Sequence, residues 1–288
     1  MKKPKKRLLY FFYILVVTGV FLYFRFPTDT ISGYLLFQAK SLFPGCEASI
    51  GSIKPTLPPG LKFKRIDFKW PNHHSIAIEQ AIVSPGYLSL FSSQTTMFFK
   101  AATCGGVLQG RVNVSGNKPV RTITAEANIE GVALKKIDWL KLVGKRELSG
   151  TLDGKLIYNQ KSTSEPLRAG LTFTDLTIEL LVPVFDMTSL AFKSVETDMV
   201  VNHQQVRINR CVLRGPKIDG NLSGSVSIKA PLEKSSFNLS GTIEIKPDFM
   251  AYLKKNLPGS LLPKKKSGSN GYPVRFFGTL DKPGFSLK

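Results

Sequence analysis

The residues whose types could carry out chemistry are few, and their spacing forms no reactive motif. His73 and His74 lie in a PNHHS segment and His203 in a VNHQQ segment, and no H-E-x-x-H pattern is present. The 288-residue sequence also lacks the G-x-S-x-G elbow of a nucleophilic serine and the G-x-x-x-x-G-K-S/T phosphate loop. We interpret the histidines as solvated turn residues. We predict no catalytic residue, no cofactor site and no metal site, which favours a protein that is not an enzyme.

The acidic residues and the cysteines add no reactive group. Cys46, Cys104 and Cys211 have no C-x-x-C spacing, so metal binding by thiolates is not predicted. All three lie in or beside apolar segments, which favours buried free thiols, with one disulfide and one leftover thiol as the alternative in an oxidising compartment. The scattered acids fall mostly on the polar side of alternating segments, where solvent accounts for them: Asp67, Glu79, Asp153, Asp175, Glu244 and Asp281.

The elements that position these residues are predicted to be strands. In the segment 218–229, apolar residues and glycines occupy even positions and polar residues occupy odd ones, which is the period of a half-buried strand. The segment 237–246 repeats the alternation after a short connector that contains Pro231, so the two segments are predicted to form an antiparallel hairpin.

Glycines in these segments alternate in phase with the apolar residues. Such glycines have no side chain to pack, so they indicate either a sharply curved sheet with a crowded concave face or a groove that accepts an acyl chain. The residues of the candidate apolar groove are Leu108, Gly110, Leu148, Gly150, Leu152, Gly154, Leu222, Gly224, Val226, Leu239 and Gly241.

Similar alternation recurs from Cys46 to the last residues, with changes of parity near Lys64 and Arg65 and between Phe173 and Leu176. Short helices are expected near 137–143 and from Pro247. The predicted fold is therefore mainly β, with a large curved antiparallel sheet or sandwich and a few short helices.

The first residues carry a membrane signal. An uncharged run covers residues 8–24, and a basic flank predicts a cytoplasmic N-terminus and an exported remainder. We expect a cytoplasmic tail at 1–7, a single transmembrane anchor at 8–26, a helical connector at 27–45 and an exported β-rich domain at 46–288. The connector is expected either to lie on the membrane or to cap the sheet. The basic residues that flank the anchor are Lys2, Lys3, Lys5, Lys6, Arg7 and Arg25.

The net charge of +20 favours anionic partners. Five of the basic residues precede the anchor, so +15 of the charge lies beyond it. Phospholipid, lipopolysaccharide and acidic neighbouring proteins are the candidates. Nucleic acid is not expected, because an exported domain rarely meets it and no nucleic-acid module is visible.

Four stretches resemble a known family: LPPGLKFKRIDFKW at 57–70, GGVLQG at 105–110, DGNLSGSVSIKAPLEKSSFNLSGTIEI at 219–245 and FFGTLDKPGFSL at 276–287. Together with the basic anchor, they resemble type II secretion system protein N, a family similar to the AsmA-like proteins of the bacterial envelope. The resemblance implies an inner-membrane protein with a periplasmic β-rich domain that is accessory to protein secretion.

Two functions are therefore expected. The resemblance favours a non-enzymatic scaffold that contacts other type II secretion components. The alternative is an AsmA-like protein that binds or transfers lipid through an apolar groove.

Overall fold

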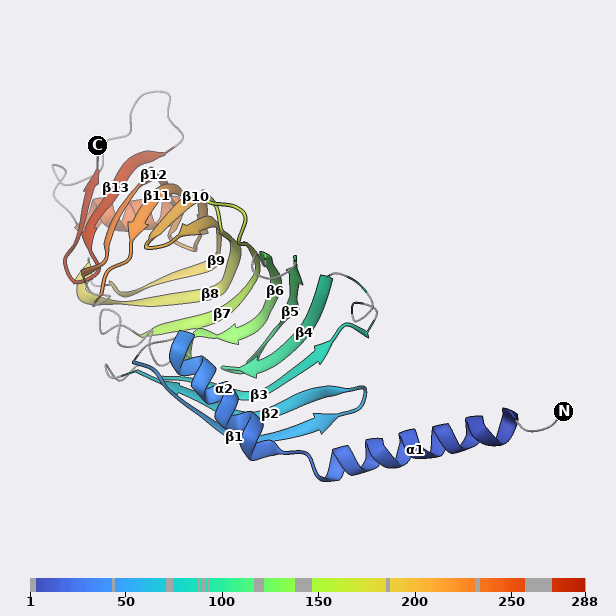
Figure 1. The fold of residues 1–288 in the computed structure, drawn as a ribbon. Helices are drawn as coiled ribbons and strands as arrows, with labels where there is room; N and C mark the ends of the chain where they lie inside the picture. The colour runs from blue at the N-terminus through green and yellow to red at the C-terminus, as the bar shows by residue number, and fades with distance from the viewer. Residues whose placement is uncertain are drawn as a thin grey trace.

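The strands of this chain form one open antiparallel sheet in which each strand pairs only with its neighbours in the sequence. The computed structural model describes residues 4–42, 45–70, 75–87, 89, 92, 94–116, 122–137, 147–184, 187–230, 234–256 and 271–287. Figure 1 shows the sheet bending along its length into a curved shell. The prediction of a mainly β, curved antiparallel sheet is confirmed. The sandwich alternative is wrong, because all fourteen strands of the described residues belong to a single sheet.

The order along the chain is two helices, then strands with short helical insertions. The strands are β1 (Glu47–Thr56), β2 (Gly60–Lys69), β3 (Ser75–Pro85), β4 (Gln94–Thr103), β5 (Gly106–Ser115), β6 (Thr122–Ala133), β7 (Leu148–Asn159), β8 (Leu167–Val184), β9 (Met187–Asn202), β10 (Gln205–Arg214), β11 (Ile218–Ser227), β12 (Ser236–Ile245), β13 (Tyr272–Thr279) and β14 (Pro283–Leu287). The helices are α1 (Pro4–Phe24), α2 (Thr28–Leu42), the 3₁₀ turn η2 (Leu134–Lys136) and α4 (Pro247–Asn256).

The predicted changes of parity are local irregularities inside continuous strands. Arg65 has a φ of 54° within β2, and Asp175 has a φ of 51° within β8. The pairing of β7 with β8 shifts between Ser149 and Thr151, beside Gly150, whose φ is 126°. Such irregularities rotate the following residues, so apolar side chains stay on one face although their parity in the sequence changes.

The sheet is a single layer and leaves much of its surface accessible. The accessible surface is 19905 Å² for a mass of 31.9 kDa, whereas a compact monomer of that mass has about 12,200 Å². A second layer that would bury one whole face is absent from the described part of the chain.

Helix α1 covers most of the predicted anchor and projects away from the sheet (Figure 1). No described helix has both the length and the apolar composition that crossing a membrane requires. Of the flanking basic residues, Lys2 and Lys3 lie outside the described residues, Lys5, Lys6 and Arg7 belong to α1, and Arg25 is exposed just after it. The apolar side chains of α1 that are exposed are Leu9, Tyr10, Phe11, Phe12, Tyr13, Ile14, Val16, Val17 and Phe21.

Helix α2 packs against β1, as the capping alternative for the connector predicts. Ile31, Leu35 and Ala39 are half-buried and recur at helical spacing, while Tyr34 and Phe37 are exposed. The helix expected at 137–143 falls mostly outside the described residues, and the short turn η2 precedes it. Helix α4 begins at Pro247, as predicted.

Candidate functional site

Strand pairing aligns apolar residues into rows that cross the sheet on one face. The row through Gly110, here called the Gly110 row, receives one residue from each of the fourteen strands. Every residue in it is apolar or glycine. Its members, in strand order, are Pro55, Leu61, Val83, Phe99, Gly110, Ala127, Leu156, Ala169, Met199, Ile208, Gly224, Leu239, Phe276 and Phe285.

Two further rows flank it on the same face. The Leu108 row contains Ile53, Phe63, Ala81, Ala101, Leu108, Ile129, Gly154, Leu171, Thr197, Cys211, Leu222, Gly241 and Val274. The Val112 row contains Pro85, Met97, Val112, Ala125, Tyr158, Leu167, Val201, Val206, Val226, Phe237, Gly278 and Pro283. Thr197 contributes the only aliphatic hydroxyl to the three rows.

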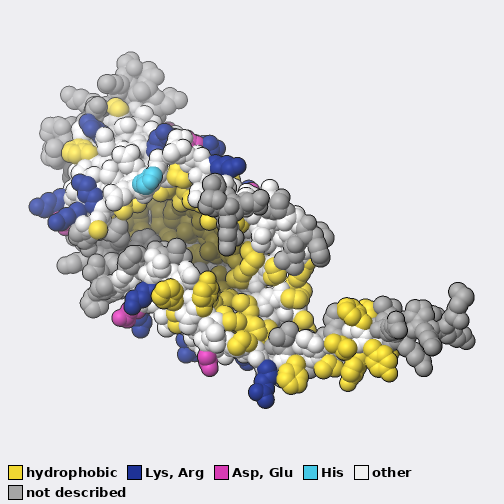
Figure 2. Space-filling model, in the orientation of Figure 1, with side chains coloured by type: hydrophobic (Ala, Val, Ile, Leu, Met, Phe, Trp, Pro, Cys, Tyr) yellow, Lys and Arg dark blue, Asp and Glu magenta, His cyan; other side chains and the backbone are white. Residues whose placement is uncertain are grey.

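These rows line a hollow, which we call the apolar trough. Figure 2 shows hydrophobic side chains lining a deep hollow over the middle strands of the sheet. In the Gly110 row, Ala169 is buried, Phe285 is exposed and the other residues are half-buried. Since strands are about 4.8 Å apart, a row that crosses fourteen strands is about 60 Å long, roughly twice the hydrocarbon thickness of a bilayer.

The glycines of the trough allow its curvature. A Cβ placed on Gly241 would lie 1.9 Å from the carbonyl oxygen of Asn221, and one on Gly224 would lie 2.1 Å from that of Asn238. The same construction places a Cβ on Gly110 at 2.0 Å from the carbonyl oxygen of Glu126. Backbone of the neighbouring strand, rather than open space, therefore meets these positions. The curvature interpretation accounts for the glycines, and the side chains around them line the trough.

One part of the apolar face is covered. Leu134 of η2 is buried against Leu176 and Val195, and this cluster includes two predicted groove residues, Leu148 and Leu152. Those two residues are therefore part of a small core instead of an open groove. The other residues packed on this cluster are Ile137, Phe173, Ile178, Phe192, Cys211 and Leu213.

The opposite face, here called the outer face, carries most of the charged and polar side chains, although Ile82, Phe98 and Ile157 also lie on it. One of its rows runs from β1 to β7 through Lys54, Lys62, Ile82, Lys100, Gln109, Asn128 and Lys155. Between β5 and β6, an Arg111 guanidinium nitrogen lies 3.1 Å from a Glu126 carboxylate oxygen, and both side chains are exposed. A pocket of about 440 Å³ lies beside these residues and is lined in part by Phe98 and Lys100.

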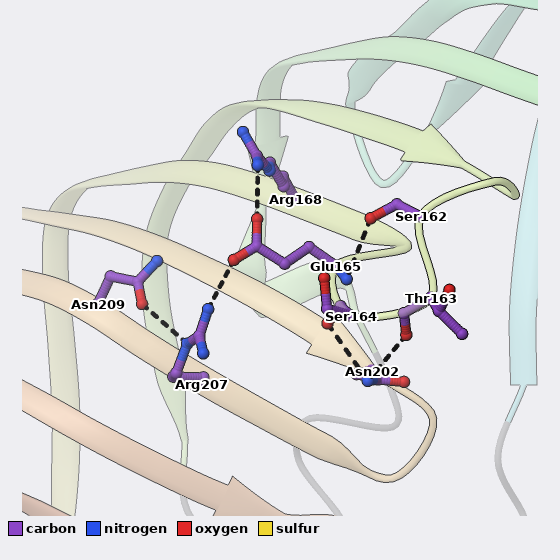
Figure 3. Close-up of polar contacts among 8 residues, drawn as sticks. All are labelled: Ser162, Thr163, Ser164, Glu165, Arg168, Asn202, Arg207 and Asn209. Atoms are coloured by element: carbon purple, nitrogen blue, oxygen red, sulfur yellow. Dashed lines mark hydrogen bonds and ion pairs between the residues drawn. The ribbon is translucent and has the colours of Figure 1, made fainter.

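A polar network pins three strands together on the outer face (Figure 3). The Glu165 carboxylate accepts hydrogen bonds from Arg168 at 2.5 Å and from Arg207 at 2.7 Å. Arg168 and Arg207 pair with Val200 from its two sides, so the carboxylate bridges them over a buried apolar side chain. The network joins the start of β8 to β10.

Glu165 lies in the loop between β7 and β8, and the Asn202 amide at the end of β9 holds the same loop. It donates to the carbonyl oxygens of Thr163 and Ser164, each at 3.3 Å (Figure 3). Both contacts use backbone acceptors, so they fix the path of the loop.

A second polar contact closes the β10–β11 connection. Asp219 accepts a hydrogen bond from the backbone N–H of Gly215 at 3.0 Å and pairs with Lys246. The hydrogen bond from Lys246 lowers the pKa of Asp219 below its usual value, and burial opposes that change. This contact joins the ends of β10 and β12.

The residues first considered for chemistry do not come together. His203 is exposed in the turn between β9 and β10, while His73 and His74 lie outside the described residues. All three cysteines are free, with Cys46 buried and Cys104 and Cys211 half-buried. In the described ranges, no three His, Cys, Asp or Glu side chains gather as potential metal ligands.

Comparison with protein-family models, curated proteins and solved structures found no match for this chain. The class of protein is therefore defined by the fold itself: a single-layer, open antiparallel sheet that carries an apolar trough on one face.

The sequence identified part of the trough and missed the rest. The strands β5, β7, β11 and β12 were recognised by their in-phase glycines, whereas Phe99, Met199 and Phe276 were not assigned to it. The missing signal was the register, because alternation tells which residues share a face within one strand but not which residues adjoin across strands.

Proposed function

We propose that this protein is a membrane-tethered protein of the bacterial envelope that holds lipid acyl chains in the apolar trough. The observation that carries this proposal is the Gly110 row, which crosses every strand without a polar side chain and stays mostly half-buried. Within the described residues, η2 covers part of this face. An exposed apolar face of this size favours aggregation unless an apolar ligand covers it.

Acyl chains suit the trough chemically. Burial of apolar surface contributes about 25 cal/mol per Å² and needs no directional contacts. The three rows contain few hydrogen-bonding side chains, so they offer little to a sugar, a nucleotide or a polar peptide. The length of the trough suits extended chains better than a compact ligand.

The tether in this proposal is the anchor expected at residues 8–26. Its support comes from the sequence, in which five basic residues precede an uncharged run of seventeen residues. The proposal accordingly places the sheet in the periplasm of a bacterial inner-membrane protein. The net positive charge beyond the anchor suits anionic lipid headgroups.

A scaffold in type II secretion is the second candidate. Its support is the resemblance described above and the edge strand β14, which pairs only with β13 among the described strands. An unpaired edge offers backbone hydrogen bonds to a strand of another protein. The two roles are compatible, but the trough is explained only by the first.

The test compares neighbouring residues on opposite faces. Leu156 belongs to the Gly110 row, whereas Ile157 lies on the outer face between Glu126 and Arg168. We expect Leu156→Glu to remove most of the lipid that co-purifies with the full chain, and Ile157→Glu to leave it unchanged, as measured by native mass spectrometry and lipid extraction. Wild-type protein that carries no lipid, or equal losses in both variants, would overturn the proposal.

A further inference from the structure

The turn between β1 and β2 presents an apolar tip to solvent. Leu57 is 84% exposed, which is the largest value among the exposed apolar side chains of the described residues. Pro58 and Pro59 beside it are also exposed. A leucine solvated at the tip of a turn adds no burial to the fold, so its side chain can bury apolar surface against a partner outside the sheet.

Hydrogen bonds hold this tip in position. The Tyr87 hydroxyl donates to the carbonyl oxygen of Pro59 at 2.9 Å, and the Thr56 hydroxyl donates to that of Pro58 at 3.3 Å. Tyr87 follows β3, so the brace connects the turn to a strand that is distant in sequence. The tip is therefore presented by a supported turn.

Lysines flank the tip on the outer face. Lys54 and Lys62 are directly paired across β1 and β2, and Lys100 continues their row. None of these three lysines forms an ion pair with another described residue. Two like charges directly opposite each other destabilise a sheet slightly. An anionic surface would relieve this repulsion.

The attachment of the sheet to α1 favours a membrane as that surface. Only residues 25–27 separate α1 from α2, and α2 packs against β1 with its first turn near α1 (Figure 1). On the exposed side of α2, Tyr34 is 63% and Phe37 is 71% exposed. Aromatic side chains of this kind are enriched where a membrane meets water.

We propose that the Leu57 turn and the Lys54–Lys62 pair form a second membrane contact, in which Leu57 enters the interfacial region and the lysines meet anionic phospholipid headgroups. Apolar tips flanked by basic residues bind anionic bilayers through burial of apolar surface and through attraction to the headgroup charge. This inference rests on the tether of the proposed function and does not depend on what fills the trough.

The test places a photo-reactive benzoylphenylalanine at position 57 of the full chain in lipid nanodiscs. One set contains phosphatidylcholine alone, and the other also contains phosphatidylglycerol. A control probe replaces Phe277, which is exposed on the outer face at the far end of the sheet. We expect intact-mass spectrometry to show lipid adducts at position 57 that increase with phosphatidylglycerol and decrease with salt, and none at position 277.

Charge variants test whether Lys54 and Lys62 contribute to this membrane contact. In the background of the position-57 probe, Lys54→Gln with Lys62→Gln is expected to lower the affinity for the anionic bilayer about fivefold for each lysine. The matched control, Lys193→Gln with Lys229→Gln, removes one exposed lysine in β9 and one just after β11, and is expected to leave the affinity unchanged.

The failures are distinguishable. A full chain that does not enter nanodiscs of either composition overturns the tether and this contact together. Insertion without a lipid adduct at position 57, or an adduct insensitive to Lys54→Gln with Lys62→Gln, overturns the contact alone. In intact cells, a protein adduct at position 57 in place of lipid would show that the turn binds an acidic protein.

Discussion

The trough face and the outer face are built from the same fourteen strands, yet they differ in almost every chemical respect. The trough face carries apolar rows and glycines that meet neighbouring backbone. The outer face carries lysines, ion pairs and the Glu165 network. One alternation pattern in each strand therefore specifies both surfaces, and pairing in register makes each surface continuous across the sheet.

The largest expected effect comes from adding a methyl group to a trough glycine. In Gly241→Ala the new Cβ would meet a carbonyl oxygen at 1.9 Å, so β11 and β12 would have to separate locally. We expect a loss of about 3 kcal/mol or more in the free energy of unfolding. Denaturant unfolding measures it.

The matched control for that variant is Gly170→Ala on the outer face. Its nearest neighbour would be a side-chain oxygen of Asp198 at 3.5 Å, an ordinary contact. We expect a change within about 0.5 kcal/mol. Equal losses in Gly170→Ala and Gly241→Ala would show that the crowding is not particular to the trough.

An intermediate effect is expected from Glu165→Gln. This substitution removes the charge that bridges Arg168 and Arg207, while the amide keeps the size of the side chain. The two arginines are largely exposed, so solvent screening limits the loss in unfolding free energy to about 1 kcal/mol. Thermal unfolding at low and high salt measures it.

The comparison for Glu165→Gln is Glu126→Gln, which removes the partner of Arg111. That pair is exposed on both sides, so we expect little measurable change in stability. A larger loss in Glu126→Gln than in Glu165→Gln would contradict the view that the Glu165 network pins β8 to β10.

The smallest change in the free energy of unfolding is expected for a substitution at Asp219, and this change depends on pH. The pKa of Asp219 is lower in the folded chain than the ordinary value of an aspartate, chiefly because Lys246 donates a hydrogen bond to its carboxylate. As the pH falls, the Asp219 carboxylate is therefore protonated in the unfolded chain before it is protonated in the folded chain. The stabilisation that ionised Asp219 contributes above pH 4 is lost as the pH falls below it.

Asp219→Asn is accordingly expected to lower stability at pH 7 by less than about 1 kcal/mol, since the pair is partly solvated. The difference from wild type should diminish toward pH 3. Unfolding midpoints of both proteins at the two pH values provide the measurement, and a difference that grows on acidification would contradict this assignment.

Much of the fold could be predicted from local patterns. The alternation in 218–246 gave the β11–β12 hairpin, and the parity change at Arg65 marked an irregularity inside β2. The strand β1 was not delineated, because its sequence EASIGSIKPT mixes small and polar residues on both sides. Its strand state depends on pairing with β2 and packing of α2, which are interactions with other segments.

The candidate site was predictable only in part for the same reason. The alternation assigns Gly110 and Gly224 to the apolar face of their own strands. Their place in one row depends on the pairing of twelve further residues in the other strands. The pairing of Lys54 with Lys62 also depends on register across a turn. The choice between a sheet and a sandwich depended on whether a second layer covers the apolar face, which alternation does not encode.

Two photo-reactive probes one residue apart show whether lipid occupies the trough. Phe99 belongs to the Gly110 row, and Phe98 lies on the outer face opposite Arg111. With benzoylphenylalanine at each position in cells, we expect lipid adducts from position 99 and a much lower yield from position 98. A protein adduct at position 99, or equal lipid yields from both positions, would contradict it.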